Sequence, residues 1–360
     1  MKMTEESYKV SNTKALHLVT HSMVAKFIRN IFVLFMRKIA RFHWLRKLRR
    51  GMNLLQQPQN NIRKVEDIWG KFARTRNQKA QLSWTDSDYI SKNYINMAIS
   101  GKPDVNWLID ALNNFVKQEI DWALNLGCGG GDVELHIKKM QMCRNMDSLD
   151  ISPEAVRVAI EKTNKEGLKG LNFFTSDIKD FKSTENKYDV VFAAASLHHF
   201  GSLEEVFGKV RTYLKKDGLF IFSEYTGPSQ FQWTDRQLEI MNDILKLLPE
   251  NLRIDHIQNK TIKNQVRRMS IQEMNQMDPS EAIRSAEIMP LVEKYFQIVK
   301  KVDYGGTLLF WLLHGVIPNF NLSDPKDKAI VDLIIFIEKK LIEYKVIPSD
   351  FAYVVAKNVK

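Results

Sequence analysis

LNLGCGGGD, at residues 124–132, joins a short apolar run to a helical pattern, as a strand does when it ends in a glycine turn and opens a helix. Glycine lets the backbone turn sharply there and lets a ligand approach without a Cβ in the way. A dinucleotide fingerprint would need glycine where Asp132 stands, and an acidic side chain at a helix start repels a pyrophosphate. The turn therefore predicts a ligand with a sugar and a cationic or neutral group, with a plain strand-to-helix connection as the alternative.

Around this turn, short apolar runs alternate with amphipathic helical stretches. The runs lie at residues 122–126, 147–150, 171–174, 188–193 and 219–223. Strands separated by helices imply an α/β fold whose doubly wound, mostly parallel sheet is covered on both faces. Gly227 and Pro228 interrupt the alternation, and residues 233–289 are then mostly helical and polar. An insertion at this point would lie above the carboxyl ends of the strands, where ligands bind in open sheets, so it is a candidate lid.

Candidate elements also lie outside this region. Residues 65–117 are mostly helical, and the chain closes with a strand at 297–304, an apolar stretch at 307–316, a helix near 326–344 and a strand at 351–355. A hydrophobic content of 44% with 26% charged residues excludes a wholly disordered or collagenous chain. Two cysteines alone cannot build a disulfide framework or a zinc site, so a reducing compartment is expected.

The net charge of +11 is concentrated near the N-terminus. Residues 7–65 hold thirteen Lys or Arg and no Asp or Glu, which leaves 40 basic and 42 acidic residues for the rest of the chain. Within this arm, Ile28, Ile31, Phe35 and Ile39 recur at steps of three and four, which is helical spacing. The arm therefore has the pattern of a basic amphipathic helix, and its apolar runs are too short to cross a bilayer.

Three interpretations of the arm stay open. It docks on an anionic membrane surface, it packs on the body of the chain or on a partner subunit, or it binds nucleic acid or serves as an organelle transit peptide. The near-neutral body argues against a surface that tracks phosphates, so nucleic acid is not expected as a partner of the body. The polar linker NLLQQPQNN at residues 53–61 separates the arm from the rest of the chain.

Two acids follow the next strands. Asp150 ends the second strand candidate, where a carboxylate can accept hydrogen bonds from both hydroxyls of a ribose. Helix capping is the alternative role, but Ser152 before Pro153 already serves it. Asp177 follows the third strand candidate and would accept from an adenine amino group, unless it is a solvated turn residue.

After the fourth strand candidate the chain reads AASLHHF at residues 194–200. Together with the glycine turn, Asp150 and Asp177, this order of segments resembles the class I S-adenosylmethionine-dependent methyltransferases. It is most similar to the small-molecule branch whose fourth strand ends in an LHH segment. The resemblance covers roughly residues 121–223 and implies a Rossmann-like sheet of seven strands with an antiparallel last strand. EYTGP at 224–228, DPSE at 278–281 and YGG at 304–306 are similar to uncharacterised bacterial members associated with glycan modification.

The resemblance implies S-adenosyl-L-methionine as the cofactor and assigns residues to it. The residues that would contact its methionine, ribose, adenine and reactive end are Asn125, Gly127, Gly129, Gly131, Asp150, Ile151, Asp177, Ile178, Ala194 and Ala195. Asn125 stands where the family usually has Asp or Glu. Methyl transfer is an in-line displacement at an activated carbon, so the protein mainly positions the nucleophile and no metal is expected.

A hydroxyl acceptor needs a base. His198 and His199 follow the fourth strand and are the candidates, with Glu224 after the fifth strand as a further base. Tyr225 would form an aromatic wall for the sulfonium, and Arg284 would face the acceptor. For either histidine, helix capping or a core hydrogen bond is the alternative.

Two further positions have structural alternatives. DPSE at 278–281 has the pattern of a helix start capped by Asp278. His314, in an apolar stretch, is a candidate substrate contact, although a buried and satisfied histidine is the stronger interpretation.

The predicted function is methyl transfer from S-adenosylmethionine to a hydroxyl of a small molecule or sugar, including a glycan. The second hypothesis is a C- or O-methyltransferase of a quinone or lipid-like acceptor, favoured by the apolar stretch at 307–316. The third is a non-catalytic member that binds the cofactor or a partner. We expect a cytoplasmic location, with peripheral contact to the membrane if the arm docks there; the sequence does not indicate an oligomeric state.

The expected organisation has five segments. They are a basic arm and linker (1–62), a helical lead-in (63–120), a cofactor-binding methyltransferase core (121–226), a helical lid or substrate insertion (227–290) and the C-terminal part of the sheet (291–360).

Overall fold

A computed structural model describes residues 62–75 and 82–359 of the chain. Residues Arg63–Lys360 form one compact unit. The amphipathic arm and the linker that follows it lie outside the described residues, so the alternatives for the arm stay predictions. None of the helices in the described ranges combines the length and the apolarity that a membrane span requires.

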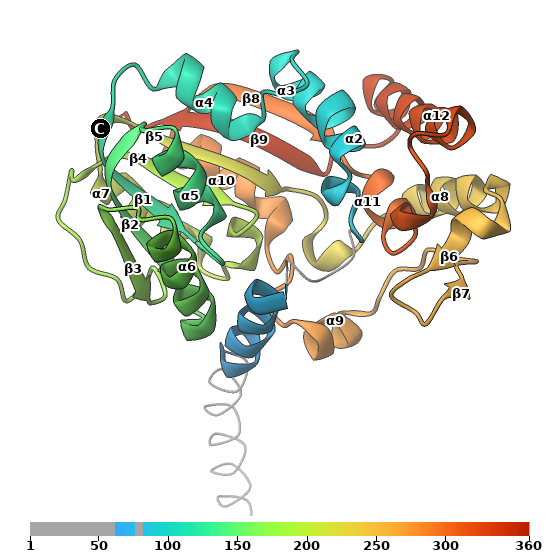
Figure 1. Ribbon diagram of the computed structural model, residues 1–360, viewed down its shortest axis with the longest axis horizontal. Helices are drawn as coiled ribbons and strands as arrows, with labels where there is room; N and C mark the ends of the chain where they lie inside the picture. Colours follow the sequence, from blue (N-terminus) through green and yellow to red (C-terminus); the bar gives the residue numbers. More distant parts are fainter. Residues whose placement is uncertain (1–61, 76–81, 360) are drawn as a thin grey trace, which may run out of the picture. The chain divides into compact units, whose positions relative to one another are not determined.

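The centre of the fold is a seven-stranded sheet (Figure 1). Its strands are β1 (Ile120–Leu126), β2 (Cys143–Asp150), β3 (Leu171–Thr175), β4 (Tyr188–Ala194), β5 (Leu214–Tyr225), β8 (Gln297–Gly305) and β9 (Phe351–Lys357). They are ordered β3-β2-β1-β4-β5-β9-β8. The first five pair in parallel, whereas β9 runs antiparallel to both of its neighbours. The predicted fold class, with its antiparallel last strand, is confirmed.

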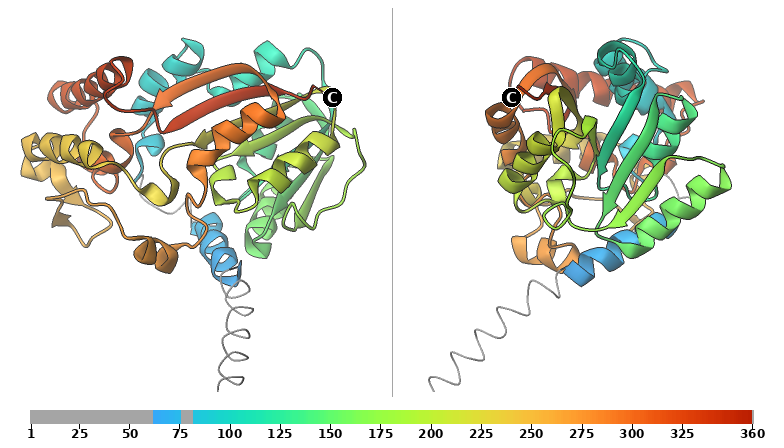
Figure 2. Two further views of the ribbon diagram at one scale, coloured as in Figure 1. Left: turned by 180° about the vertical axis from the view of Figure 1, so that it is seen from behind. Right: turned by 90° about the vertical axis from the view of Figure 1, so that its left-hand side faces the viewer.

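Helices cover both faces of the sheet, which explains why the strands are apolar on both sides (Figure 2). Ala123 and Val190 belong to one hydrophobic cluster with residues of α4 (Trp107–Phe115), α5 (Asp132–Lys139) and α12 (Pro325–Glu343). Their chain neighbours Leu124 and Val191 belong to a second cluster with residues of α7 (Leu203–Tyr213) and α10 (Ile288–Tyr295). Successive side chains of a strand point to opposite faces, so each strand contributes to both cores.

Short helices precede the sheet and follow β5. The lead-in contains η2 (Trp84–Asp86), α2 (Asp88–Ile90), η3 (Ser91–Asn96) and α3 (Met97–Ser100). The insertion after β5 contains η5 (Ser229–Phe231), α8 (Asp235–Leu247), η6 (Glu250–Arg253), a small hairpin of β6 (Ile254–Asp255) and β7 (Thr261–Ile262), α9 (Ile271–Met277) and η7 (Ser285–Glu287). Ile283 of the insertion donates a backbone hydrogen bond to the carbonyl of His198, so the insertion meets the loop after β4.

The remaining elements close the fold. They are α6 (Pro153–Lys165), η4 (Leu197–His199), α11 (Leu309–Leu313) and η8 (Ile317–Asn319). Ser152 caps α6 by accepting from Ala155 N, and Pro153 occupies the first turn, so the helix begins where the predicted cap lies. The apolar stretch that contains α11 lies in the core, since Leu308, Leu309 and Leu312 are fully buried.

A buried carboxylate holds the start of this apolar stretch, and its removal is expected to destabilise the fold. Glu338 accepts hydrogen bonds from the backbone N–H groups of Gly306, Leu308 and Leu309 and from the hydroxyl of Tyr94. Glu338→Ala leaves three backbone N–H groups and the Tyr94 hydroxyl without this acceptor, and we expect the free energy of unfolding to fall by about 3–5 kcal/mol. Tyr94→Phe removes one hydrogen bond and should cost about 1 kcal/mol in the same denaturation experiment. Equal losses for the two variants would contradict this assignment.

Candidate active site

The glycine turn after β1 has the backbone conformation that its sequence predicts. Gly127, Gly129 and Gly131 have φ angles of 75°, 49° and 78°, in the left-handed region that favours glycine. A Cβ on Gly127 would lie 2.5 Å from the Cβ of Ser196, so a side chain is excluded there by the loop after β4. A Cβ on Gly129 would meet nothing within 4 Å, so this position opens on free space.

Asp150 lies against this turn. One of its carboxylate oxygens accepts from the backbone N–H of Gly129 at 2.9 Å, and the other accepts from Ser152 N at 2.9 Å. Burial raises the pKa of Asp150, and the backbone donors oppose that shift. Ile151 supplies a third backbone hydrogen bond, and because a carboxylate has about four lone-pair sites, at least one further bond to a ligand is possible. The neighbouring Ile151 is half-buried. A carboxylate beside a side-chain-free turn fits a ribose with two hydroxyls.

Asn125 is engaged by a residue that the sequence did not single out. Its amide donates to Glu134 Oε1 at 2.7 Å, and both side chains are buried. Burial raises the pKa of Glu134, which lies in the first turn of α5. Asn125 Oδ1 and Glu134 Oε2 are buried without a hydrogen-bond partner. Glu134 therefore supplies an acid beside Asn125, the position where the family usually has one.

The other predicted cofactor residues lie at the same edge of the sheet. Asp177 follows β3, and its Oδ1 accepts from Lys179 N at 2.9 Å, while Ile178 is buried. Ala194 ends β4, and Ala195 has a φ of 48° and donates its N–H to Ser223 O. Because β1, β2, β3 and β4 are parallel and in register, these positions follow the carboxyl ends of neighbouring strands.

Glu224 organises the loop after β4. Its Oε2 accepts from the backbone N–H groups of Ser196 and Leu197 at 2.8 Å and 2.7 Å, and its Oε1 accepts from Tyr225 N and pairs with Nδ1 of His198. Burial lowers the pKa of His198, but the charge and hydrogen bond of Glu224 outweigh it and raise the pKa to about 9. Glu224 therefore orients the His198 ring and stabilises its protonated form.

His199 has a different environment. Its Nδ1 lies 3.1 Å from Ser280 Oγ, which itself donates to Asp278 Oδ1. The ring contacts Trp69 at a centroid distance of 4.7 Å, and the Trp69 indole donates to Asp278 Oδ2. Burial and the neighbouring His198 hold the pKa of His199 well below its usual value. His199 is therefore a neutral imidazole at pH 7.

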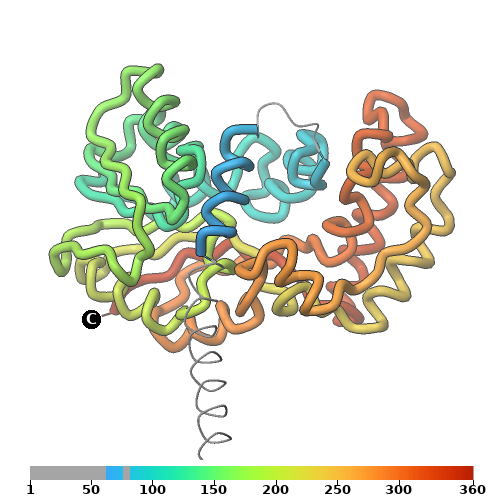
Figure 3. Tube along the Cα trace, turned by 90° about the horizontal axis from the view of Figure 1, so that it is seen from below, coloured from blue at the N-terminus to red at the C-terminus, as the bar shows by residue number. Residues whose placement is uncertain are grey.

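Trp69 belongs to the helix over residues 62–75, drawn in blue in Figure 3. Ser152 Oγ donates to the backbone carbonyl of Glu66, and Arg74 pairs with Glu154 at the start of α6. The helix thus contacts both the loop after Asp150 and the His199 ring. Trp69 was not among the predicted site residues, because no local sequence signal links it to His199 in the loop after β4.

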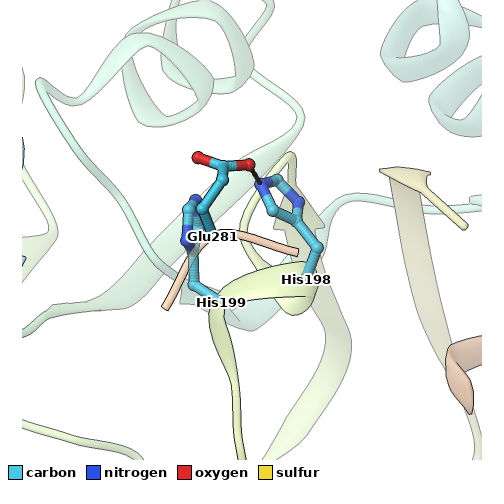
Figure 4. Close-up of side chains that lie close together, drawn as sticks. All are labelled: His198, His199 and Glu281. Atoms are coloured by element: carbon cyan, nitrogen blue, oxygen red, sulfur yellow. Dashed lines mark ion pairs between the residues drawn. The ribbon is translucent and has the colours of Figure 1, made fainter. Parts of the chain in front are cut away.

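The prediction that residues 278–281 start a helix is wrong. Helix α9 ends at Met277, and the chain then turns, because Asp278 Oδ1 accepts from both the backbone N and the hydroxyl of Ser280. This turn brings the carboxylate of Glu281 to 3.5 Å from Nε2 of His198 (Figure 4). Burial raises the pKa of Glu281, and His198 opposes that shift. Glu281 therefore lies beside His198. Its sequence pattern had predicted a different role, at the start of a helix.

The three predicted substrate contacts lie in different surroundings. Tyr225 is buried, and its ring centroid lies 6.3 Å from that of His198. Arg284 donates to both carboxylate oxygens of Glu204 and also pairs with Glu287. His314 packs against Trp311, and its Nδ1 is buried without a hydrogen-bond partner. The structure therefore brings Tyr225 to the histidines, whereas the guanidinium of Arg284 is occupied by acids.

The sheet order, the glycine turn after β1 and the acid after β2 together define the class I S-adenosylmethionine-dependent methyltransferases. Comparison with known protein families points to the same class. A family model described as "Methyltransferase domain" matches residues 121–294. Residues 121–294 therefore carry the methyltransferase domain, and the cofactor of the class is S-adenosylmethionine.

Individual relatives match only parts of the chain. "Malonyl-[acyl-carrier protein] O-methyltransferase 2" of Ilyobacter polytropus is 27% identical over 38% of this chain and 52% of its own length. The enzyme of that name in Halalkalibacterium halodurans is 22% identical over 54% of this chain and 78% of its own length. A putative sarcosine dimethylglycine methyltransferase from Galdieria sulphuraria is a similar solved structure, with a TM-score of 0.41, 14% identity and coverage of 70% of this chain and 84% of its own. The chain thus spans about half the length of the first of these relatives.

Proposed function

We propose that this chain transfers a methyl group from S-adenosylmethionine to a hydroxyl oxygen of a neutral small molecule, such as a sugar, with His198 as the proton acceptor. The observation that carries the proposal is the buried pair of His198 and Glu224 after β4, in which Nδ1 faces Glu224 and Nε2 lies on the other side of the ring, 3.5 Å from Glu281. A positioned histidine with a carboxylate behind it is the usual form of a general base.

The cofactor residues are part of the same proposal. The open position at Gly129 and the lone pairs of Asp150 support binding of the ribose, and Asp177 with Ile178 support binding of adenine. Gly127, Gly131, Ala194 and Ala195 offer backbone on the path from ribose to the reactive end. S-adenosylmethionine supplies a methyl group on a sulfonium, so the chain has to hold the acceptor oxygen in line with that carbon.

The charge of the site favours a neutral acceptor. Glu224, Asp278 and Glu281 all contribute to the shift of the His198 pKa, so carboxylates surround the imidazole. An anionic acceptor would be repelled by them in a partly buried site. Glu224 is engaged by backbone donors, so we assign proton transfer to Nε2 of His198, the imidazole that Glu224 holds. Loss of a proton from the acceptor hydroxyl to Nε2 then makes an imidazolium, which Glu224 stabilises.

A carboxylate acceptor is the second candidate, and the relatives named malonyl-[acyl-carrier protein] O-methyltransferases favour it. His198 would then act as an imidazolium that binds the carboxylate, since a pKa of about 9 keeps it protonated at pH 7. A quinone or other apolar acceptor has lost its main support, because the apolar stretch around α11 fills the core. The non-catalytic alternative predicts cofactor binding without turnover on any acceptor, and replacement of His198 or His199 would then change only stability.

The pH profile separates these candidates. If His198 is the base, kcat/KM should rise with pH, by about tenfold per unit at pH values well below the pKa of about 9, and level off above it. If His198 binds a carboxylate as an imidazolium, activity should stay level and fall above about 9. The measurement is initial rates with labelled S-adenosylmethionine on sugar, phenol and carboxylic acid acceptors.

A stability control accompanies the pH profile. A histidine with a raised folded-state pKa contributes stability below its unfolded-state pKa, and that contribution is lost as the pH rises through about 9. Circular dichroism at each pH therefore has to show a folded chain before a fall in rate is assigned to the carboxylate mechanism.

Two features of the chain bear on its compartment and on contact with a membrane. Both cysteines are free, which supports a reducing compartment such as the cytoplasm. The basic arm supports docking on an anionic membrane, where a lipid-linked sugar would be presented. Deletion of residues 1–60 should abolish binding to anionic liposomes and leave turnover of a soluble acceptor unchanged. Unchanged liposome binding by the truncated chain would refute the docking role.

A further inference from the structure

Three side chains of the site bring potential metal-ligand atoms close together. One ligand atom each from His198, His199 and Glu281 lies within 4.8 Å of the other two (Figure 4). His198 and His199 come from η4, and Glu281 comes from the turn after α9. Two imidazoles and one carboxylate are a ligand set that divalent transition metals take in proteins.

Hydrogen bonds orient both imidazoles for such a role. Because Ser280 Oγ donates to Asp278, it accepts from Nδ1–H of His199. The lone pair of His199 is therefore on Nε2, and this atom is buried without a hydrogen-bond partner. His198 is held in the same way, since its Nδ1 pairs with Glu224 and its Nε2 faces Glu281. Metal-bound histidines are held by acceptors of this kind on their other nitrogen.

The carboxylates around the two histidines favour a bound cation. Glu224 and Glu281 lie within ion-pair distance of His198, and Asp278 accepts from Ser280, the hydrogen-bond partner of His199. A single proton on His198 compensates only part of this buried negative charge. A divalent ion between the three lone pairs would compensate more of it, and carboxylates that lack compensation are costly in a buried site.

We propose that Nε2 of His198, Nε2 of His199 and a carboxylate oxygen of Glu281 bind one Zn²⁺ ion. Three protein ligands leave a coordination position open, as in catalytic zinc sites. This inference rests on the proposed function in one respect, because the open position would receive the acceptor hydroxyl. Coordination lowers the pKa of a bound oxygen, so the hydroxyl would lose its proton to solvent. His198 would then be a ligand, since a single lone pair on Nε2 cannot serve the metal and the proton together.

The test measures metal binding on the full chain with S-adenosylmethionine present. Zn²⁺ is titrated by calorimetry, and Co²⁺ is used as a spectroscopic probe whose visible absorption reports a site of low coordination number. We expect one ion per chain. His199→Ala and Glu281→Gln should each weaken binding at least about 100-fold, and Ser280→Ala, which removes only the acceptor on His199 Nδ1, about 10–100-fold.

A matched control guards against adventitious binding by other histidines. His256 is exposed and hydrogen-bonds to Asn319, and His256→Ala should leave Zn²⁺ affinity unchanged. Undiminished S-adenosylmethionine binding confirms that each variant is folded. Equal Zn²⁺ affinity of the unaltered chain and Glu281→Gln would overturn the metal site. Tight Zn²⁺ binding without methylation of any hydroxyl acceptor would instead overturn the proposed function and leave the metal site standing.

Discussion

Replacing His198 by alanine is expected to lower kcat for a hydroxyl acceptor by about 10²–10⁴-fold. The imidazole is the proposed acceptor of the hydroxyl proton, and Glu224 beside it stabilises the charged ring. Alanine removes this imidazole and with it one ligand of the proposed Zn²⁺ site. The measurement is single-turnover methyl transfer with saturating cofactor, together with cofactor affinity, which should change little.

Two comparisons make this result interpretable. The exposed His256→Ala variant should keep full activity. Glu224→Gln removes the charge that raises the His198 pKa, so the rising limb of the pH profile should move to lower pH. A His198→Ala enzyme that keeps more than about a tenth of the unaltered rate would contradict the role of His198 as the base.

Replacing Asp150 by alanine is expected to weaken S-adenosylmethionine binding by at least about 100-fold, because hydrogen bonds to a charged group are worth roughly 1.5–3 kcal/mol each and a ribose offers two. The carboxylate also holds Gly129 N and Ser152 N, so the variant loosens the glycine turn itself. Asp150→Asn keeps one acceptor oxygen and should give an intermediate loss. Calorimetric titration with the cofactor and with its demethylated product measures the loss of affinity in both variants.

The control for Asp150 is an acid on the neighbouring loop. Asp180 follows β3 and is exposed, and Asp180→Ala should bind the cofactor as the unaltered chain does. Melting temperatures of all variants separate a lost ligand contact from a loosened fold. Undiminished cofactor affinity in a folded Asp150→Ala chain would remove the ribose assignment, and with it the argument that the glycine turn and Asp150 form one binding site.

The strands were predictable because their signals are local. Apolar runs bounded by polar residues located β1, β3 and β4 to within two residues at each end. Strands β2 and β5 begin earlier than predicted, at Cys143 and Leu214. Their first residues include Arg144 in β2 and Lys215 in β5, and such charged side chains hide a strand from a hydrophobic pattern although backbone pairing continues through them.

Local pattern therefore accounts for the glycine turn, Asp150 and the order of the strands, since turn chemistry and periodicity depend on neighbours in the chain. The cluster of His198, His199 and Glu281 could not be found in this way. The DPSE segment satisfies the pattern of a capped helix, yet the tertiary contacts of Ser280 with His199 and of Glu281 with His198 hold it as a turn. Only the packing of the insertion against the loop after β4 brought Glu281 to the histidines, because a contact between residues far apart in sequence depends on the whole fold.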